Sequence, residues 1–205
     1  MFGSLWYYQS NKTIEQMEAV GVKTQENNEQ TILLYPERGD VSFKATPNDE
    51  WKKVTVSPTV IPNQSIVQTG IGKASVLLPD NSSISLEENT EITVNYTPQA
   101  ISVYQNLGTT YHRVEALITG KTYQVQTAGT LAAVRGTKFA VKYDIKTKKT
   151  KIAVTEHKVE VSSIPKTVGT TTIPAQIVMV EEGKTVSIEV KEGIQQGKPT
   201  PLLII

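Results

Sequence analysis

The residues that could carry out chemistry are few and lie far apart in the sequence. The chain has two histidines, His112 and His157, and no cysteine. A zinc site would need both histidines together with carboxylates, and no ligand spacing supports one. We therefore expect no metal and no cofactor, and we expect each histidine to be a surface or strand residue.

Other catalytic patterns are weak. Serine and threonine are plentiful, but no Gly-x-Ser-x-Gly turn occurs. Glu87, Glu88 and Glu91 cluster near a predicted strand end, where paired carboxylates could do acid–base work, but we favour a solvated turn. Gly70 and Gly72 precede a strand-like run, whereas a phosphate loop needs a helix after it. We expect that the protein is not an enzyme.

Lysines are concentrated in one stretch that reads as a hairpin. In residues 149–152 they alternate with positions of buried type, so they share an exposed face. Such a face could meet anionic lipid or wall polymer. Lysines also prevent edge-to-edge pairing of sheets, and we favour this second interpretation. The lysines of this basic surface are Lys142, Lys146, Lys148, Lys149 and Lys151.

The elements that would position these residues are predicted to be β-strands. Short runs rich in Val, Ile and Thr recur about every eight to twelve residues, separated by Gly, Pro, Asn and Asp. The predicted strands are 31–35, 41–45, 51–56, 65–69, 74–78, 82–86, 91–96, 101–105, 110–118, 123–127, 138–143, 150–155, 158–161, 176–180 and 185–190. We predict an all-β fold, and even spacing fits a sandwich, a barrel or a twisted β-solenoid.

We expect three regions. Residues 1–30 form a membrane-proximal segment and linker with a helical turn, residues 31–190 form the β domain, and residues 191–205 form a connector and an apolar tail. The cluster of Trp6, Tyr7 and Tyr8 is typical of a membrane interface, so we expect a membrane anchor upstream of Met1; an ordinary aromatic strand is the alternative. The net charge of +1 gives no indication of nucleic-acid binding.

Four segments, in order, carry a resemblance. Residues 61–70 and 74–92 are similar to the pattern "G-D-x-I-x-T-G" followed by "D-G-S-x-x-x-L" and "N-T-x-[LI]" of the FecR domain. Residues 125–141 resemble its "V-R-G-T-x-F-x-V" segment, and residues 150–161 its final hairpin. The match spans residues 41–161. The motif residues are Thr69, Gly70, Asp80, Asn81, Asn89, Thr90, Thr127, Arg135, Gly136, Thr137 and Phe139.

The chain departs from the family pattern at three positions. Gln64 replaces the usual Asp, while Asn81 and His157 replace glycines. Asparagine tolerates the left-handed conformation, so Asn81 should preserve its turn, whereas His157 indicates a different turn. Gly136 reads as a bulge or a close backbone approach. Arg135 could hold a carboxylate bidentately, but we favour a structural use of this segment.

The resemblance implies a non-catalytic, FecR-like twisted β-solenoid or sandwich located outside the cytoplasm, in the periplasm or at the cell surface. Well-known members relay a receptor signal to a sigma factor through a cytoplasmic helical segment ahead of a membrane helix. This sequence shows no such segment, so we expect a membrane-anchored module that senses or scaffolds a protein or cell-envelope partner. The alternative is a homo-oligomeric subunit of a surface filament or layer, joined by strand addition.

Overall fold

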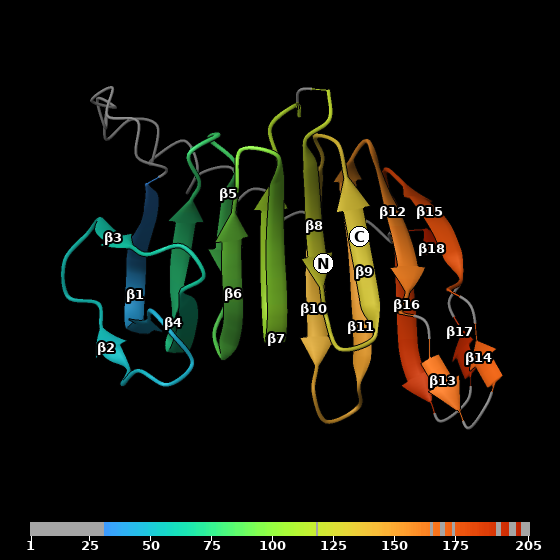
Figure 1. Ribbon diagram of the computed structural model, residues 1–205, viewed down its shortest axis with the longest axis horizontal. Helices are drawn as coiled ribbons and strands as arrows, with labels where there is room; N and C mark the ends of the chain where they lie inside the picture. Colours follow the sequence, from blue (N-terminus) through green and yellow to red (C-terminus); the bar gives the residue numbers. More distant parts are fainter. Residues whose placement is uncertain are drawn as a thin grey trace.

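The computed structural model describes residues 31–117, 119–164, 166–168, 171–173, 175–191, 194–196 and 200–201. All the regular elements in these ranges are strands (Figure 1). They are β1 (Ile32–Lys44), β2 (Lys52–Lys53), β3 (Thr59–Ile61), β4 (Ile66–Leu77), β5 (Ser83–Leu86), β6 (Thr90–Tyr96), β7 (Ala100–Arg113), β8 (Thr122–Gln126), β9 (Thr130–Val134), β10 (Lys138–Asp144), β11 (Lys149–Glu156), β12 (Lys158–Ser163), β13 (Lys166–Val168), β14 (Thr171–Ile173), β15 (Ile177–Glu181), β16 (Lys184–Lys191), β17 (Ile194–Gln196) and β18 (Thr200–Pro201).

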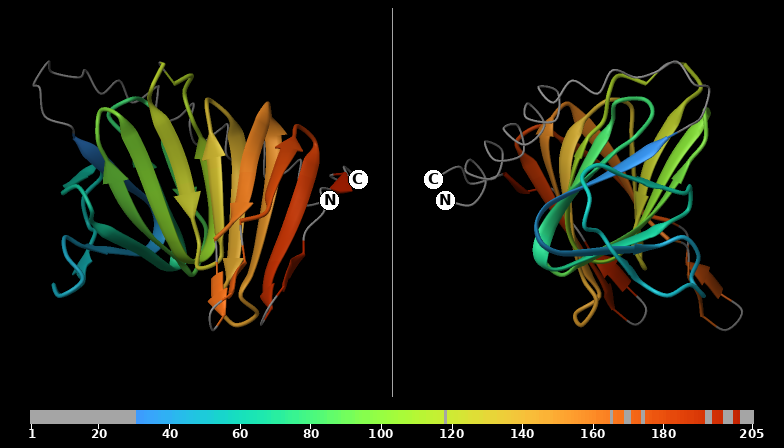
Figure 2. Two further views of the ribbon diagram at one scale, coloured as in Figure 1. Left: turned by 45° about the vertical axis from the view of Figure 1, so that its right-hand side comes forward. Right: turned by 90° about the vertical axis from the view of Figure 1, so that its left-hand side faces the viewer.

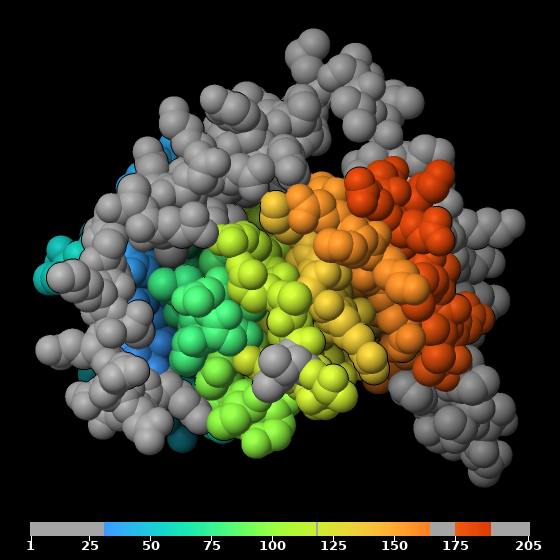
Figure 3. Space-filling model, turned by 90° about the horizontal axis from the view of Figure 1, so that it is seen from above, coloured from blue at the N-terminus to red at the C-terminus, as the bar shows by residue number. Residues whose placement is uncertain are grey.

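β13 and β14 form a separate two-stranded sheet, and the other strands form one sheet that is folded into two facing layers. Layer A contains β15, β12, β9 and β8, followed by the first half of β7 and by β6. Layer B contains β16, β11 and β10, followed by the second half of β7 and by β5. Seen from above, the chain advances from β1 to β16 along the long axis (Figure 3). The all-β prediction is confirmed.

Three long strands pass from one layer to the other. β7 pairs with β6 and β8 through its first half and with β5 and β10 through its second half. β1 and β4 bend in the same way, and Figure 2 shows the resulting U-shaped cross-section. The sequence predicts two strands in each of these places, because glycines interrupt the apolar runs. The structure shows bends there instead of strand ends.

The bend of β7 depends on Gly108. Its φ is +92°, which side chains of L-residues rarely adopt, and a Cβ atom there would collide with Oγ1 of Thr90. The backbone of β7 therefore comes against the start of β6. This close approach closes the end of the two-layer structure opposite the β9–β10 connection.

Between the layers lies a core built from the inward faces of both. Alternation is clean in β6, where Ile92 and Val94 are fully buried and Thr93 lies outside. Tyr123 of layer A and Phe139 of layer B are the largest fully buried side chains. The core is thus of the kind that forms between two packed sheets.

A chain of polar contacts crosses this core. His112 is 2% exposed, and its ring stacks on Phe139 with the ring centroids 4.7 Å apart. Its Nδ1 atom lies 2.8 Å from the hydroxyl of Tyr123, and its Nε2 atom lies 2.7 Å from Oγ1 of Thr110. His112 is a strand residue as expected, but an interior one rather than a surface one.

These hydrogen bonds determine which ring nitrogen of His112 carries the proton. Oγ1 of Thr110 donates its proton to Oε1 of Gln105 at 2.7 Å, so it accepts from Nε2–H of His112. Nδ1 is then unprotonated and accepts from the hydroxyl of Tyr123. Gln105 in turn donates to the carbonyl oxygens of Gly108 and Val141. Each buried polar group in this series of hydrogen bonds, from Tyr123 to Gln105, has a partner, as stability in an apolar core requires.

Candidate functional site

The first group of motif residues closes the bend between β4, β6 and β7. Thr69 donates to the carbonyl oxygen of Glu87 at 2.5 Å and accepts from the backbone N–H of Thr90 at 3.1 Å. Oγ1 of Thr90 accepts from the N–H of Thr109 at 3.0 Å. The N–H of Asn89, whose φ is +53°, donates to the carbonyl oxygen of Gly70. These contacts hold strands together, as the structural interpretation of the motif expects.

The turn after β4 is tied to the loop before β8. Asn81 has a φ of +65°, so the expected left-handed turn is present. Asp80 accepts from the N–H of Ser82 at 3.1 Å and forms an ion pair of 2.7 Å with Lys121. Both charged side chains of this pair are largely buried, with 15% of Asp80 and 8% of Lys121 exposed.

The Arg135–Thr137 segment carries the chain from layer A to layer B. Gly136 has a φ of +96°, and a Cβ atom there would lie 3.0 Å from Cα of Ala116. The predicted close backbone approach is present. Thr137 donates its hydroxyl to the carbonyl oxygen of Lys158 at 3.2 Å. The segment therefore connects three parts of the chain at one end of the structure.

The remaining turn positions show one correction. His157 has a φ of +61°, the left-handed conformation that glycine favours, and its N–H donates to Oε2 of Glu182 at 3.3 Å. The expectation of a different turn at His157 is wrong, because the backbone keeps this conformation without a glycine. Thr127 lies in the core, where its hydroxyl is 2.8 Å from that of Thr150.

A groove of about 430 Å³ lies on the outer face of layer A. It crosses the ends of β8, β9, β12 and β15 that lie beside the Arg135–Thr137 segment. Register places Gln124, Ala133, Glu160 and Met179 in one row across these four strands. The residues that line the groove are Lys121, Thr122, Tyr123, Gln124, Ala133, Val134, Arg135, Lys158, Glu160 and Met179.

Charges at this groove are available for a ligand. Arg135, Lys158 and Glu160 are exposed, and within the described ranges no ion pair involves any of them. Ala133 and Met179 add apolar surface, with Met179 43% exposed. Two cations, one carboxylate and an apolar strip suit an extended peptide with an acidic side chain. The sequence indicated Arg135 alone, because the others become neighbours only through strand register.

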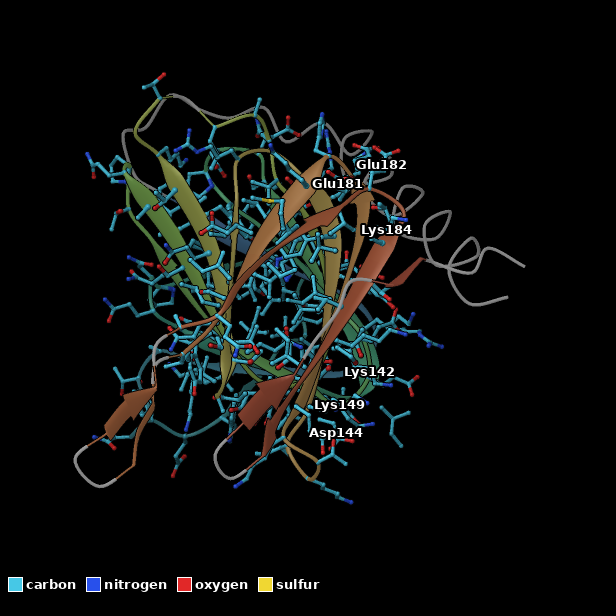
Figure 4. All side chains as sticks on the ribbon, turned by 90° about the vertical axis from the view of Figure 1, so that its right-hand side faces the viewer. Lys142, Asp144, Lys149, Glu181, Glu182 and Lys184 are labelled. Carbon is cyan, nitrogen blue, oxygen red and sulfur yellow. The ribbon has the colours of Figure 1, made fainter. Side chains whose placement is uncertain are left out.

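The lysines of the basic surface lie at the other end of the molecule, around the β10–β11 turn. Lys142 and Lys151 lie on the outer face of layer B, and Figure 4 shows Lys142 and Lys149 near the β10–β11 turn. The favoured explanation for these lysines is wrong, however. β10 pairs with β7 and β11, and β11 pairs with β10 and β16, so neither strand has a free edge to protect.

Two further searches concern metals and membranes. Within the described part of the chain, no group of three or more His, Cys, Asp or Glu side chains could hold a metal ion. No helix in that part has the length and apolar character needed to cross a bilayer. The predicted linker at residues 1–30 and the apolar tail at residues 202–205 lie outside the described residues.

Two facing layers, with family-motif residues that hold the turns and bends between strands, define an all-β domain. Residues 65–160, somewhat less than half of the chain, match the family model described as FecR protein. This match agrees with the resemblance that the motifs carry. No curated protein matches the sequence.

Solved structures support the fold. Two crystal structures of a proposed anti-sigma factor from Parabacteroides distasonis ATCC 8503, at 1.65 Å and 2.50 Å, are similar to this chain with TM-scores of 0.55 and 0.53. Both are 18% identical to it and cover 66% and 65% of it. The chain spans only 59% and 57% of their length, so the likeness concerns the fold alone.

Proposed function

We propose that this chain is a non-catalytic interaction module of a signal-transduction protein, and that it binds an envelope protein partner through the groove on layer A. The FecR match and the fold shared with a proposed anti-sigma factor support a regulatory role. In this proposal the domain lies outside the cytoplasm and is anchored to the membrane. The observation that carries it is the pair of exposed cations, Arg135 and Lys158, which form no ion pair with a described residue and lie beside the apolar strip of the groove.

The groove suits recognition better than catalysis. Its lining residues include neither histidine nor cysteine. The hydroxyl of Tyr123 is directed into the core, where it donates to His112. Arg135 has the planar fork that binds a carboxylate through two hydrogen bonds. A partner segment with one acidic side chain and an adjacent apolar side chain would satisfy both parts of the groove.

The test is site-specific photo-cross-linking of the full-length protein in its native cells. A photoreactive amino acid replaces Gln124 in the groove, and the matched control replaces Ala153 on the outer face of layer B. We expect a discrete adduct with one protein from position 124 only, and we expect Arg135→Glu with Lys158→Glu to abolish it. The same double variant should change the transcription of a defined set of genes. Equal adducts at both positions, or an adduct unaffected by the charge reversals, would contradict the proposal.

A second candidate is a subunit of a surface assembly, and one edge favours it. β15 pairs with β12 on one side and, among the described strands, with none on the other. It exposes 66% of Ile177 and contains neither lysine nor proline. Sedimentation of the purified chain tests this alternative: concentration-dependent association that Ile177→Lys removes would favour assembly, and a monomer at every concentration would exclude this edge as an assembly contact.

A further inference from the structure

We propose that the tip of the β10–β11 hairpin docks onto an anionic lipid bilayer. The docking surface consists of Lys142, Lys146, Lys148, Lys149 and Lys151 together with Ile145. This inference does not depend on the groove, which is lined by the other layer. Figure 1 shows that the starts of β8 and β12, which line the groove, lie at the opposite end of the strands from the β10–β11 turn.

The first observation is an opposed pair of like charges. Lys142 and Lys151 are cross-strand partners in the middle of layer B, and both side chains are exposed. Their other neighbours in the same row are Thr109 and Ser187, which carry no charge. Like charges placed directly opposite each other destabilise a sheet. Edge protection does not explain these lysines, and an external anion would relieve the repulsion between them.

The second observation is an exposed apolar side chain between the lysines. Ile145 is 56% exposed in the turn that joins β10 to β11, and Lys146 and Lys148 follow it in the same turn. An isoleucine that stays exposed to water contributes nothing to the stability of the fold. At a bilayer, it can enter the boundary between headgroups and acyl chains while the lysines remain at the phosphates. An apolar tip within a basic rim therefore favours lipid over a wall polymer, which offers no apolar phase.

Among the described residues, two carboxylates lie at the rim of this surface. Asp144 accepts from the backbone N–H groups of Lys146 and Thr147 at 2.8 and 3.1 Å, and these bonds hold the pKa of its carboxyl below the ordinary value. Its charge therefore stabilises the turn itself. Glu189 lies opposite Lys149 in the register of β11 and β16. Counted over the described residues, five lysines and two carboxylates give the tip a positive charge.

The geometry is compatible with the proposed function. The groove lies where β8 and β12 begin, and the tip lies where β10 ends. With the tip on a bilayer, the groove would face away from the lipid, toward a partner. Figure 4 shows Glu181, Glu182 and Lys184 at the end opposite the tip, where acidic side chains would oppose docking.

The test uses purified protein and phosphatidylcholine vesicles with and without phosphatidylglycerol, in a flotation assay. We expect binding only to the anionic vesicles, and a fall in affinity of about fivefold per lysine in Lys142→Gln with Lys151→Gln. This double variant removes a repulsion, so it should be at least as stable to heat as the parent. The matched control is Lys184→Gln at the opposite end of layer B, which should bind like the parent.

Insertion of the tip is tested with a fluorescent label. Because the chain has no cysteine, one introduced cysteine carries a single label. An environment-sensitive dye on Ile145→Cys should shift to shorter wavelength with anionic vesicles, and the same dye on Lys184→Cys should not. Absence of binding to anionic vesicles at physiological ionic strength overturns the proposal. Retained binding with unchanged dye emission also overturns the proposal. The tip would then recognise phosphate charge alone, without inserting into the bilayer, and an anionic wall polymer would be an equally good ligand.

Discussion

The ring of His112 on β7 accepts a hydrogen bond of 2.8 Å from the hydroxyl of Tyr123 on β8, and thereby links the two layers through the middle of the core. The second half of β7 belongs to layer B and β8 belongs to layer A. Because the ring is neutral and both its nitrogens are satisfied, the contact specifies how the layers face each other. It also makes folding sensitive to acid.

The free energy of unfolding should decrease as the pH is lowered, because the buried His112 ring takes up a proton much less readily in the folded state than in the unfolded state. Burial lowers its pKa to about 3, from an ordinary value of 6.5. Between these values the unfolded chain binds a proton that the folded chain does not, so the free energy of unfolding decreases by about 1.4 kcal/mol per pH unit as pH falls. Above pH 6.5 this contribution is constant. Urea unfolding at neutral and acidic pH measures the slope.

The control for this pH dependence is His157→Gln. That histidine is exposed, so its replacement should leave the slope unchanged. A free energy of unfolding that stays level through the acidic range, or a titration of the His112 ring near its ordinary pKa followed by NMR, would show that the ring reaches solvent.

Replacement of Tyr123 by Phe should destabilise the fold although it removes a single oxygen atom. Nδ1 of His112 would lose its donor in a fully buried setting, which costs about 1–3 kcal/mol. Thermal or chemical unfolding measures the loss. Tyr104→Phe is the matched control, because Tyr104 is 40% exposed on the outer face of layer A and should change stability little. Equal stability of the two variants would mean that the buried contact contributes nothing.

Gly136→Val should destabilise the protein by more than about 2 kcal/mol. A β-branched side chain is strained at a φ of +96°, and its Cβ atom would press on Cα of Ala116 at 3.0 Å. The melting temperature measures this effect. A variant that melts near the parent temperature would show that the connection from β9 to β10 can move away from Ala116.

Gly108→Ala and Gly120→Ala separate the cost of backbone conformation from the cost of crowding. Their φ values are +92° and +89°, but a Cβ atom at Gly120 meets nothing within 4 Å, whereas one at Gly108 collides with Thr90. Gly120→Ala should cost only the conformational strain, about 1–2 kcal/mol. Gly108→Ala should cost clearly more. Similar unfolding free energies for the two variants would show that the bend of β7 relaxes.

The sequence alone determined the chemistry of the strands and turns. Alternation of apolar and polar residues gave the all-β class, because period two is a local property of a half-buried strand. The motif residues identified the FecR domain, and Asn81 was correctly assigned to a left-handed turn. Gly136 was predicted to lie at a bulge or a close backbone approach, and the structure shows a close approach, to Cα of Ala116.

Tertiary structure alone decided which strands are neighbours. The apolar runs around Gly108 looked like two strands, and only pairing of one continuous strand with both layers shows a bend. His112 has an ordinary strand context in the sequence, yet facing strands enclose it. The lysines of β10 and β11 looked like edge protection until pairing with β7 and β16 placed them mid-sheet. Strand pairing joins residues that are distant in sequence. The local pattern of apolar and polar residues within one strand does not say which strands pair with its two edges.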